Sequence, residues 1–154
     1  MPKIEKITKQ TENPYVNLYL VEGKNKVDHP FRYYVASRAK TMEALKIKTK
    51  KNTPDGVLMY SLYGEKRDKI VLVRQYRVSI DDYIYEFPAG LVESGEEFHE
   101  AAVREMHEET GLTFHPLKVD PCYEKPFFTT IGMTDEACSA VYGLSLIHIS
   151  EPTR

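Results

Sequence analysis

The stretch from residue 90 to residue 112 constrains this chain most, because it reads as a helix with acidic residues on its apolar side. At about 100° per residue, four apolar side chains share one helical face: Phe98, Ala101, Ala102 and Met106. Glu105 and Glu109 fall on the same face, so two carboxylates are predicted to point toward the core. A buried carboxylate without a partner is costly, and metal ions would neutralise both. The alternative, a solvent-facing acidic helix, does not account for glutamates within the apolar face.

Composition and charge exclude several classes of partner. The chain has 154 residues with a net charge of -2, so its overall charge does not favour nucleic acid. A Lys-rich stretch at 39–54 is interpreted as a solvated connecting loop, since no aromatic platform accompanies it. No apolar run reaches membrane-spanning length and no signal peptide opens the chain, which predicts a cytoplasmic protein without membrane contact. Cys122 and Cys138 form neither a disulfide framework nor a metal-ligand pattern by spacing.

Aromatic and β-branched runs predict an antiparallel strand pair at 15–21 and 31–37, after a frayed stretch at 1–12. Further strands are expected at 57–63, 69–76, 83–87, 117–123 and 137–142, with a hairpin connection at 64–68 and a loop at 126–136. The helix is expected to begin at a cap formed by Ser94 or Glu97 and to end at Gly111. Strands on both sides of one helix predict an α/β sandwich built on a mixed sheet.

Glu105, Glu108 and Glu109 stand at spacing i, i+3 and i+4, which places their carboxylates on adjoining positions of one helix. They repel one another unless divalent ions lie between them. Carboxylate oxygens are hard ligands that suit Mg²⁺, with Mn²⁺ as the alternative, and Mg²⁺ commonly couples carboxylates to substrate phosphates. The pattern therefore favours metal-assisted chemistry on a pyrophosphate. The nearby histidines are interpreted as exposed residues rather than ligands: His99, His107 and His115.

The same stretch resembles the signature of the Nudix hydrolases, G-x5-E-x7-R-E-U-x-E-E-x-G-U, where U is a bulky aliphatic residue. Every specified position is matched, by Gly90, Glu96, Arg104, Glu105, Met106, Glu108, Glu109, Gly111 and Leu112. The resemblance implies a Nudix-type α/β/α sandwich with a mixed sheet, truncated at its C-terminus. It also implies a metal site formed by the glutamates with the backbone carbonyl of Ala89. Arg104 is grouped with the catalytic glutamates, although a structural pair of Arg104 with Glu96 is the simpler interpretation.

Matches outside that signature narrow the substrate. VRQYR at 73–77, EFPAG at 86–90, GMTDE at 132–136 and the downstream Pro126 resemble the subgroup that hydrolyses ADP-ribose and related nucleoside diphosphate sugars. The resemblance implies substrate contacts from Arg38, Arg77, Leu91, Thr130, Ile131, Gly132 and Glu136. The alternative for Arg77 is an ordinary surface charge at a strand end. Where the subgroup usually has S-P-G, this chain has Thr-Ile-Gly, which leaves the exact substrate open.

The resemblance implies an enzyme that uses Mg²⁺ to hydrolyse the diphosphate of ADP-ribose to AMP and ribose 5-phosphate. Its partner would be a small-molecule nucleoside diphosphate derivative, and its natural form a homodimer joined through the N-terminal strands. The general base is expected on a loop beyond Gly143. Two alternatives stay open: a Nudix-fold nucleotide-binding or sensor module without turnover, and a nucleoside triphosphate pyrophosphatase. The intact set of three glutamates argues against a pure binder.

Residues 144–154 (LSLIHISEPTR) resemble the translation of a sequencing-library adapter and are expected to be non-native. The alternative is a genuine final strand, SLIHI, with a polar tail. This interpretation divides the chain into an N-terminal strand pair at 1–40 for dimerisation and substrate lining, a Nudix core at 41–143 and the tail at 144–154. The C-terminal part of the core would then be missing.

Overall fold

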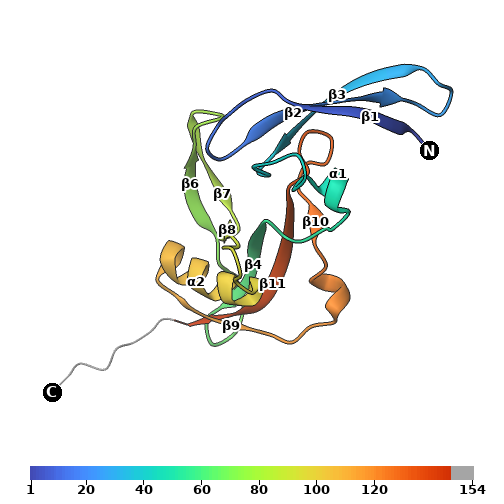
Figure 1. The fold of residues 1–154 in the computed structure, drawn as a ribbon. Helices are drawn as coiled ribbons and strands as arrows, with labels where there is room; N and C mark the ends of the chain where they lie inside the picture. The colour runs from blue at the N-terminus through green and yellow to red at the C-terminus, as the bar shows by residue number, and fades with distance from the viewer. Residues whose placement is uncertain (147–154) are drawn as a thin grey trace. The chain divides into compact units, whose positions relative to one another are not determined.

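The computed structural model describes residues 1–146, and its contacts divide the chain into two compact units (Figure 1). The N-terminal unit comprises Met1–Thr53 together with Phe128–Ala137, and the helix unit comprises Pro54–Phe127 together with the described residues 138–146. These units follow from contacts alone. The division into 1–40, 41–143 and 144–154 concerns function and origin, so it stays a prediction.

The N-terminal unit is built on an antiparallel sheet in the order β1-β2-β3, with β1 at Lys3–Lys9, β2 at Asn17–Lys24 and β3 at Pro30–Ser37. The pairing of β2 with β3 confirms the predicted antiparallel pair. The expectation that residues 1–12 are frayed is wrong, because β1 pairs with β2. This strand is mostly exposed and mixes lysines with isoleucines. Such polarity is usual in an edge strand, which is why its apolar signal is weak.

The segment that returns to this unit, Phe128–Ala137, hydrogen-bonds to β3. The backbone N–H of Ala36 donates to the carbonyl of Met133 at 2.9 Å, and the hydroxyl of Tyr33 donates to the carbonyl of Gly132 at 2.5 Å. The predicted loops at 39–54 and 126–136 are mostly irregular, and each carries one short element. These are the helix α1 (Lys46–Thr49) and the strand β10 (Phe127–Phe128).

The helix unit contains a mixed sheet whose central strands, β4 (Gly56–Tyr63) and β11 (Ala137–Leu146), run parallel. The strands β5 (Lys69–Ile70) and β8 (Ala89–Leu91) pair antiparallel with β4, and β9 (Thr113–Pro116) pairs antiparallel with β11. These pairs confirm the predicted mixed sheet. The helix α2 (Phe98–Thr110) contributes its apolar face to one core, formed by Val57, Met59, Val71, Ala101, Ala102, Met106, Phe114 and Val141.

Two predicted strands differ in the structure: one is split and the other does not form within the described residues. The strand expected at 69–76 is split, because β5 ends at Ile70 and β6 (Val73–Arg77) pairs with β7 (Asp82–Glu86) in a separate two-stranded sheet. Among the described residues, no strand forms at 117–123. Strand β9 ends before this range, and the 3-10 helix η1 (Pro121–Tyr123) lies within it. Asp120 caps η1 by accepting the N–H of Cys122 at 2.9 Å. An Asp-Pro start thus outweighs the β-propensity of the neighbouring residues.

Strand β11 extends past Gly143 to Leu146, so the start of the tail expected to be non-native lies in the sheet. Ser145 is buried, and its Oγ lies 2.7 Å from the Oγ of Ser61 on β4. The rest of the tail, 147–154, lies outside the described residues, and the origin of the tail stays a prediction. Within residues 1–146, no helix is long and apolar enough to cross a lipid bilayer.

Candidate active site

Local hydrogen bonds determine where α2 begins and ends. The carboxylate of Glu97 accepts the backbone N–H of His99 at 2.8 Å, which caps the first turn. Gly111 adopts a left-handed conformation with φ of 71° and donates its N–H to the carbonyl of His107 at 2.8 Å. Both ends confirm the prediction, with Glu97 rather than Ser94 as the cap. The positions of the glutamates along α2 therefore follow from local chemistry.

Arg104 joins α2 to the loop that precedes it. Its Nε and Nη2 each lie 2.9 Å from a carboxylate oxygen of Glu96, and Nη2 also donates to the carbonyl of Leu91 at 3.1 Å. Its Nη1 lies 2.9 Å from Glu105 and 3.4 Å from Glu108. Hydrogen bonds from the guanidinium lower the pKa of Glu96 to about 2 and raise that of Arg104. This network confirms the structural pair, while a catalytic role for Arg104 stays a prediction.

Glu105 lies directly against Gly90. A Cβ atom at Gly90 would overlap the carboxyl group of Glu105, so only glycine leaves room for that side chain. The Glu105 side chain is 15% exposed, which confirms the prediction that it points inward. Its charge is balanced there by Arg104. The glycine of the signature thus serves a close approach between the loop and α2.

For Glu109 the prediction of burial is wrong, because this residue is exposed in the last turns of α2. Its Oε2 accepts the backbone N–H of Ala89 at 3.1 Å. Partial desolvation of the carboxyl group raises the pKa of Glu109, although the Ala89 N–H opposes this. The charges of Glu105 and Glu86 raise this pKa further, and Arg77 lowers it. Three carboxylates and one guanidinium therefore lie within electrostatic range of one another.

Arg77 reaches this group of charges from the hairpin formed by β6 and β7. Its Nη2 lies 2.6 Å from Oε1 of Glu86, the last residue of β7. The Arg77 side chain is 45% exposed and that of Glu86 is 25% exposed. The sequence predicted Arg77 as a site residue but missed Glu86. Its signal was its place as the first residue of EFPAG, at the end of a strand that leads into Ala89.

The residues present fit a divalent cation in their chemistry. Glu105 and Glu109 supply hard oxygen ligands, and the carboxyl group of Glu109 is partly desolvated and lies near the charges of Glu105 and Glu86, which together raise its pKa. Glu105 and Glu108 are engaged by Arg104 as described above, and within residues 1–146 no three acidic, histidine or cysteine side chains converge on a single point. Side-chain rotation of these glutamates would be needed to close a shell around an ion.

In the N-terminal unit, Arg38 and Glu136 form an ion pair, with Nε 2.7 Å from Oε1. They line a cavity of about 300 Å³ together with Thr130 and with Val16, Ala36, Ser37, Met133 and Thr134. The structure thus brings together three predicted substrate contacts from distant parts of the sequence. Gly132 is engaged through its carbonyl by Tyr33, and neither it nor Ile131 lines this cavity.

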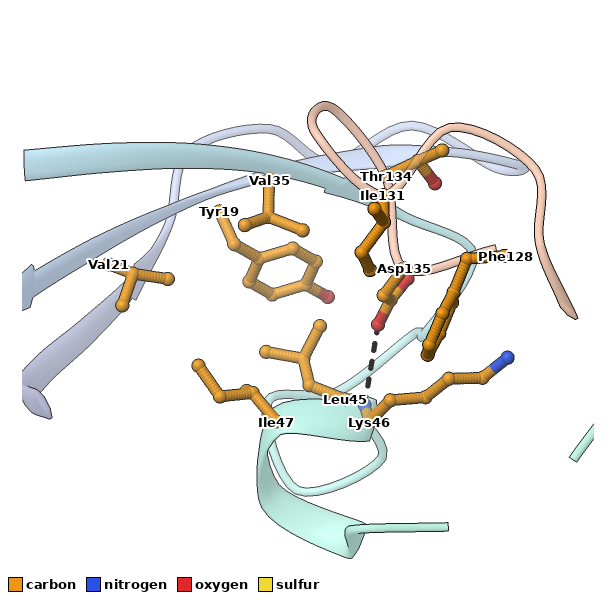
Figure 2. A pocket seen from close by; sticks show the side chains of 10 residues that line it. All are labelled: Tyr19, Val21, Val35, Leu45, Lys46, Ile47, Phe128, Ile131, Thr134 and Asp135. Atoms are coloured by element: carbon orange, nitrogen blue, oxygen red, sulfur yellow. Dashed lines mark hydrogen bonds between the residues drawn. The ribbon is translucent and has the colours of Figure 1, made fainter. Parts of the chain in front are cut away.

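Ile131 instead lines a second, mostly apolar cavity of about 280 Å³ in the same unit (Figure 2). Figure 2 shows Tyr19 and Val35 facing Leu45 and Ile47 across this space, with Phe128 beside them. The Tyr19 hydroxyl donates to the carbonyl of Ala39 at 2.7 Å, and Asp135 accepts the N–H of Lys46 at 3.3 Å. The sequence did not predict this cavity, because its walls come from segments about ninety residues apart.

The interpretation of His99 as an exposed residue is wrong. Its side chain is 34% exposed, with Nδ1 2.9 Å from Glu97 and Nε2 2.8 Å from Glu124. Burial alone would lower the pKa of His99, but the hydrogen bonds to Glu124 and Glu97 outweigh it and raise the pKa. His99 therefore ties the start of α2 to the residue that follows η1, within the helix unit.

Comparison with known proteins identifies the family. The family model described as the NUDIX domain matches residues 52–144, which is more than half of the chain. The chain belongs to the Nudix family. The match covers the strand β4, the whole of α2 and most of β11 in this Nudix domain. It confirms the family that the glutamate signature indicated.

Relatives match this Nudix domain over part of their length. The chain is 35% identical over 80 residues to the ADP-ribose pyrophosphatase of Saccharomyces cerevisiae (strain ATCC 204508 / S288c), a match that covers 51% of this chain and 35% of that protein. It is 44% identical over 61 residues to the ADP-ribose pyrophosphatase of Bacillus subtilis (strain 168), covering 39% and 33%. The matches therefore span about a third of the length of these curated relatives.

The fold is similar to that of a solved structure described as the crystal structure of ADP compounds hydrolase. The TM-score is 0.68 at 20% sequence identity, and the likeness covers 99% of this chain and 74% of that chain. At such low identity the likeness concerns the fold. It confirms the predicted Nudix-type α/β fold with a mixed sheet.

Proposed function

We propose that the protein hydrolyses the diphosphate bond of ADP-ribose, or of a related nucleoside diphosphate sugar, and releases AMP (or another nucleoside monophosphate) and a sugar phosphate. The observation that carries this proposal is the arrangement around α2, where Arg104 holds Glu96 and Glu105 while Gly90 leaves room for Glu105. The yeast and Bacillus relatives, both described as ADP-ribose pyrophosphatases, support this substrate class.

Nudix hydrolases generally use divalent metal ions, and Mg²⁺ is the proposed ion, with Mn²⁺ as the alternative. Glu105, Glu108 and Glu109 would hold it, together with the backbone carbonyl of Ala89. A bound divalent ion supplies charge neutralisation at the diphosphate and a lowered pKa for a coordinated water. The three glutamates offer hard oxygen ligands from adjoining positions of one helix, which supports this fit.

The chain's own residues bind and orient the substrate. Arg77 carries a permanent positive charge and binds the diphosphate through its guanidinium. Within the N-terminal unit, the ion pair of Arg38 with Glu136 and the cavity that they line support the proposed substrate contacts of these two residues. The remaining proposed contacts are Leu91, Thr130, Ile131 and Gly132. The backbone polar groups of these four residues and the hydroxyl of Thr130 orient the substrate, while cleavage of the diphosphate depends on the glutamates of α2.

A homodimer joined through the N-terminal strands and a cytoplasmic location complete the proposal. Tyr33 and Tyr34 on β3 are 45% and 51% exposed, and exposed tyrosines of this kind are enriched in protein interfaces. Size-exclusion chromatography with light scattering measures the assembly. A monomer at every protein concentration would contradict the dimer.

The test is release of AMP from ADP-ribose by the full-length protein in the presence of Mg²⁺. Glu109→Gln keeps the shape of the side chain but removes its charge, and it is expected to lower kcat/KM by about 100-fold. The matched control is Glu100→Gln, at an exposed position of the same helix, which is expected to leave activity unchanged. Activity of Glu109→Gln equal to wild type would refute the metal assignment.

Other outcomes identify the alternatives. Binding of ADP-ribose without product over hours would indicate a nucleotide-binding or sensor module. Preference for nucleoside triphosphates over ADP-ribose would indicate a triphosphate pyrophosphatase on the same fold.

A further inference from the structure

Glu86 is a charged residue at the end of β7 to which neither the metal proposal nor the substrate proposal gives a role. Its Oε1 is buried without a hydrogen bond of regular geometry and forms an ion pair with Arg77, 2.6 Å from Nη2. Within residues 1–146, this ion pair is the contact seen for the Arg77 side chain. The direction of Arg77 therefore depends on Glu86.

The register of the hairpin shows how far Arg77 must reach. Arg77 stands opposite Asp82, next to the turn, whereas Glu86 stands opposite Val73 at the other end of the hairpin. The separation of Asp82 from Glu86 along β7 is about 13 Å at roughly 3.3 Å per residue. An arginine meets a glutamate across this length only when its side chain runs back along the strands. Glu86 thus draws the guanidinium away from the turn and toward the base of the hairpin.

The base of the hairpin leads directly to the proposed metal site. Glu86 is followed by Phe87, Pro88 and Ala89, and the N–H of Ala89 donates to Glu109. Glu86 therefore draws the guanidinium toward the end of the hairpin from which the chain runs three residues on to Ala89 and its hydrogen bond with Glu109, a proposed metal ligand.

We propose that Glu86 is a positioning residue for the substrate diphosphate. It holds the Arg77 guanidinium beside the carboxylates of α2, so that a diphosphate bound by Arg77 lies next to those carboxylates. This inference rests on the proposed function, which makes Arg77 a diphosphate contact. Glu86 orders Arg77 before the substrate arrives, so its loss weakens substrate binding more than turnover.

The test compares KM and kcat of full-length Glu86→Gln with those of wild type, using ADP-ribose and Mg²⁺. KM is expected to rise about tenfold, because a charge-assisted contact to the guanidinium is lost, while kcat changes less than about threefold. Glu86→Asp keeps the charge on a shorter side chain and is expected to recover part of the loss. The matched control is Glu100→Gln, which removes the charge of an exposed glutamate on α2 and is expected to leave KM unchanged.

A double variant separates positioning from a merely structural role. Arg77→Gln alone is expected to raise KM, and adding Glu86→Gln to it should raise KM no further, because Glu86 acts through Arg77. Independent effects of the two substitutions on KM would overturn the inference. A fall in kcat with unchanged KM in Glu86→Gln would also overturn it.

Failure of the inference and failure of the proposed function give different results. Wild-type hydrolysis of ADP-ribose with unaltered kinetics in Glu86→Gln would overturn the inference and leave the function standing. If wild type does not hydrolyse ADP-ribose, titration calorimetry with inorganic pyrophosphate measures diphosphate binding directly. Weaker pyrophosphate binding by both Glu86→Gln and Arg77→Gln would support the role of Glu86, and wild-type affinity in Glu86→Gln would overturn it.

Discussion

Replacing Ser61 with alanine should destabilise the helix unit through the hydroxyl that remains on the neighbouring strand. Ser61 on β4 and Ser145 on β11 are 0% and 1% exposed, and their Oγ atoms lie 2.7 Å apart. The contact of Ser61 with its other acceptor, the carbonyl of Leu62, is long at 3.4 Å. Removing either hydroxyl leaves its partner buried without its main hydrogen bond.

The size of the effect follows from this burial. A buried hydroxyl without a partner costs about 1–3 kcal/mol, so Ser61→Ala and Ser145→Ala should each lower the free energy of unfolding by that amount. The double variant removes both polar groups at once and is expected to cost about 1 kcal/mol less than the sum of the two. In a domain of about 150 residues, 1 kcal/mol shifts Tm by about 2–4 °C.

Urea denaturation of the 154-residue chain and its variants measures these differences. The matched control is Ser94→Ala, at an exposed loop position, which should change stability by less than about 0.5 kcal/mol. Additive losses from the two core variants would refute the coupling. Wild-type stability of Ser145→Ala would refute the placement of Ser145 in β11.

Three further predictions concern α2 and its neighbours. His99→Gln should lower the free energy of unfolding more at pH 5.5 than at pH 8.5. A histidine with a raised pKa contributes its full stabilisation below about pH 6.5 and loses it as the pH rises through the pKa of the folded state. Equal losses at the two pH values in urea titrations would contradict this. Met106→Ala should lower the free energy of unfolding by about 2–5 kcal/mol in the same titrations, because Met106 is 0% exposed in the core. A loss below about 1 kcal/mol would contradict that packing. Gly90→Ala should displace Glu105 by on the order of 1 Å and weaken the binding of Mn²⁺. Electron paramagnetic resonance measures the Mn²⁺ affinity, and an affinity equal to that of wild type would contradict the need for glycine.

The helix that carries the candidate site could be predicted almost completely from the sequence. Glu97 and Gly111 delimit α2 through bonds to residues two and four positions away, so the chain encodes these ends locally. The apolar face also follows from the helical period, and Ala101, Ala102 and Met106 are buried as expected. Family membership follows from the spacing of the glutamates, which is itself a local property.

Strand bounds were less predictable, because pairing depends on partners far away in the chain. The run at 69–76 has a uniform β-propensity, yet its first part pairs with β4 and its last part with β7. Nothing in the run itself marks the break between Ile70 and Val73. Similarly, β1 forms because β2 offers an edge, and its own polarity does not indicate a strand.

The sequence by itself determined the helix, the set of carboxylates on it, the mixed character of the sheet and the family. Tertiary structure alone decided which carboxylate points inward and which charges meet. The helical period assigns Glu105 and Glu109 to one face, but only Glu105 lies against Gly90, while Glu109 reaches the N–H of Ala89 at an exposed position. The physical reason is distance along the chain: caps and periodicity act over a few residues, whereas burial and ion pairing depend on segments that meet only after folding.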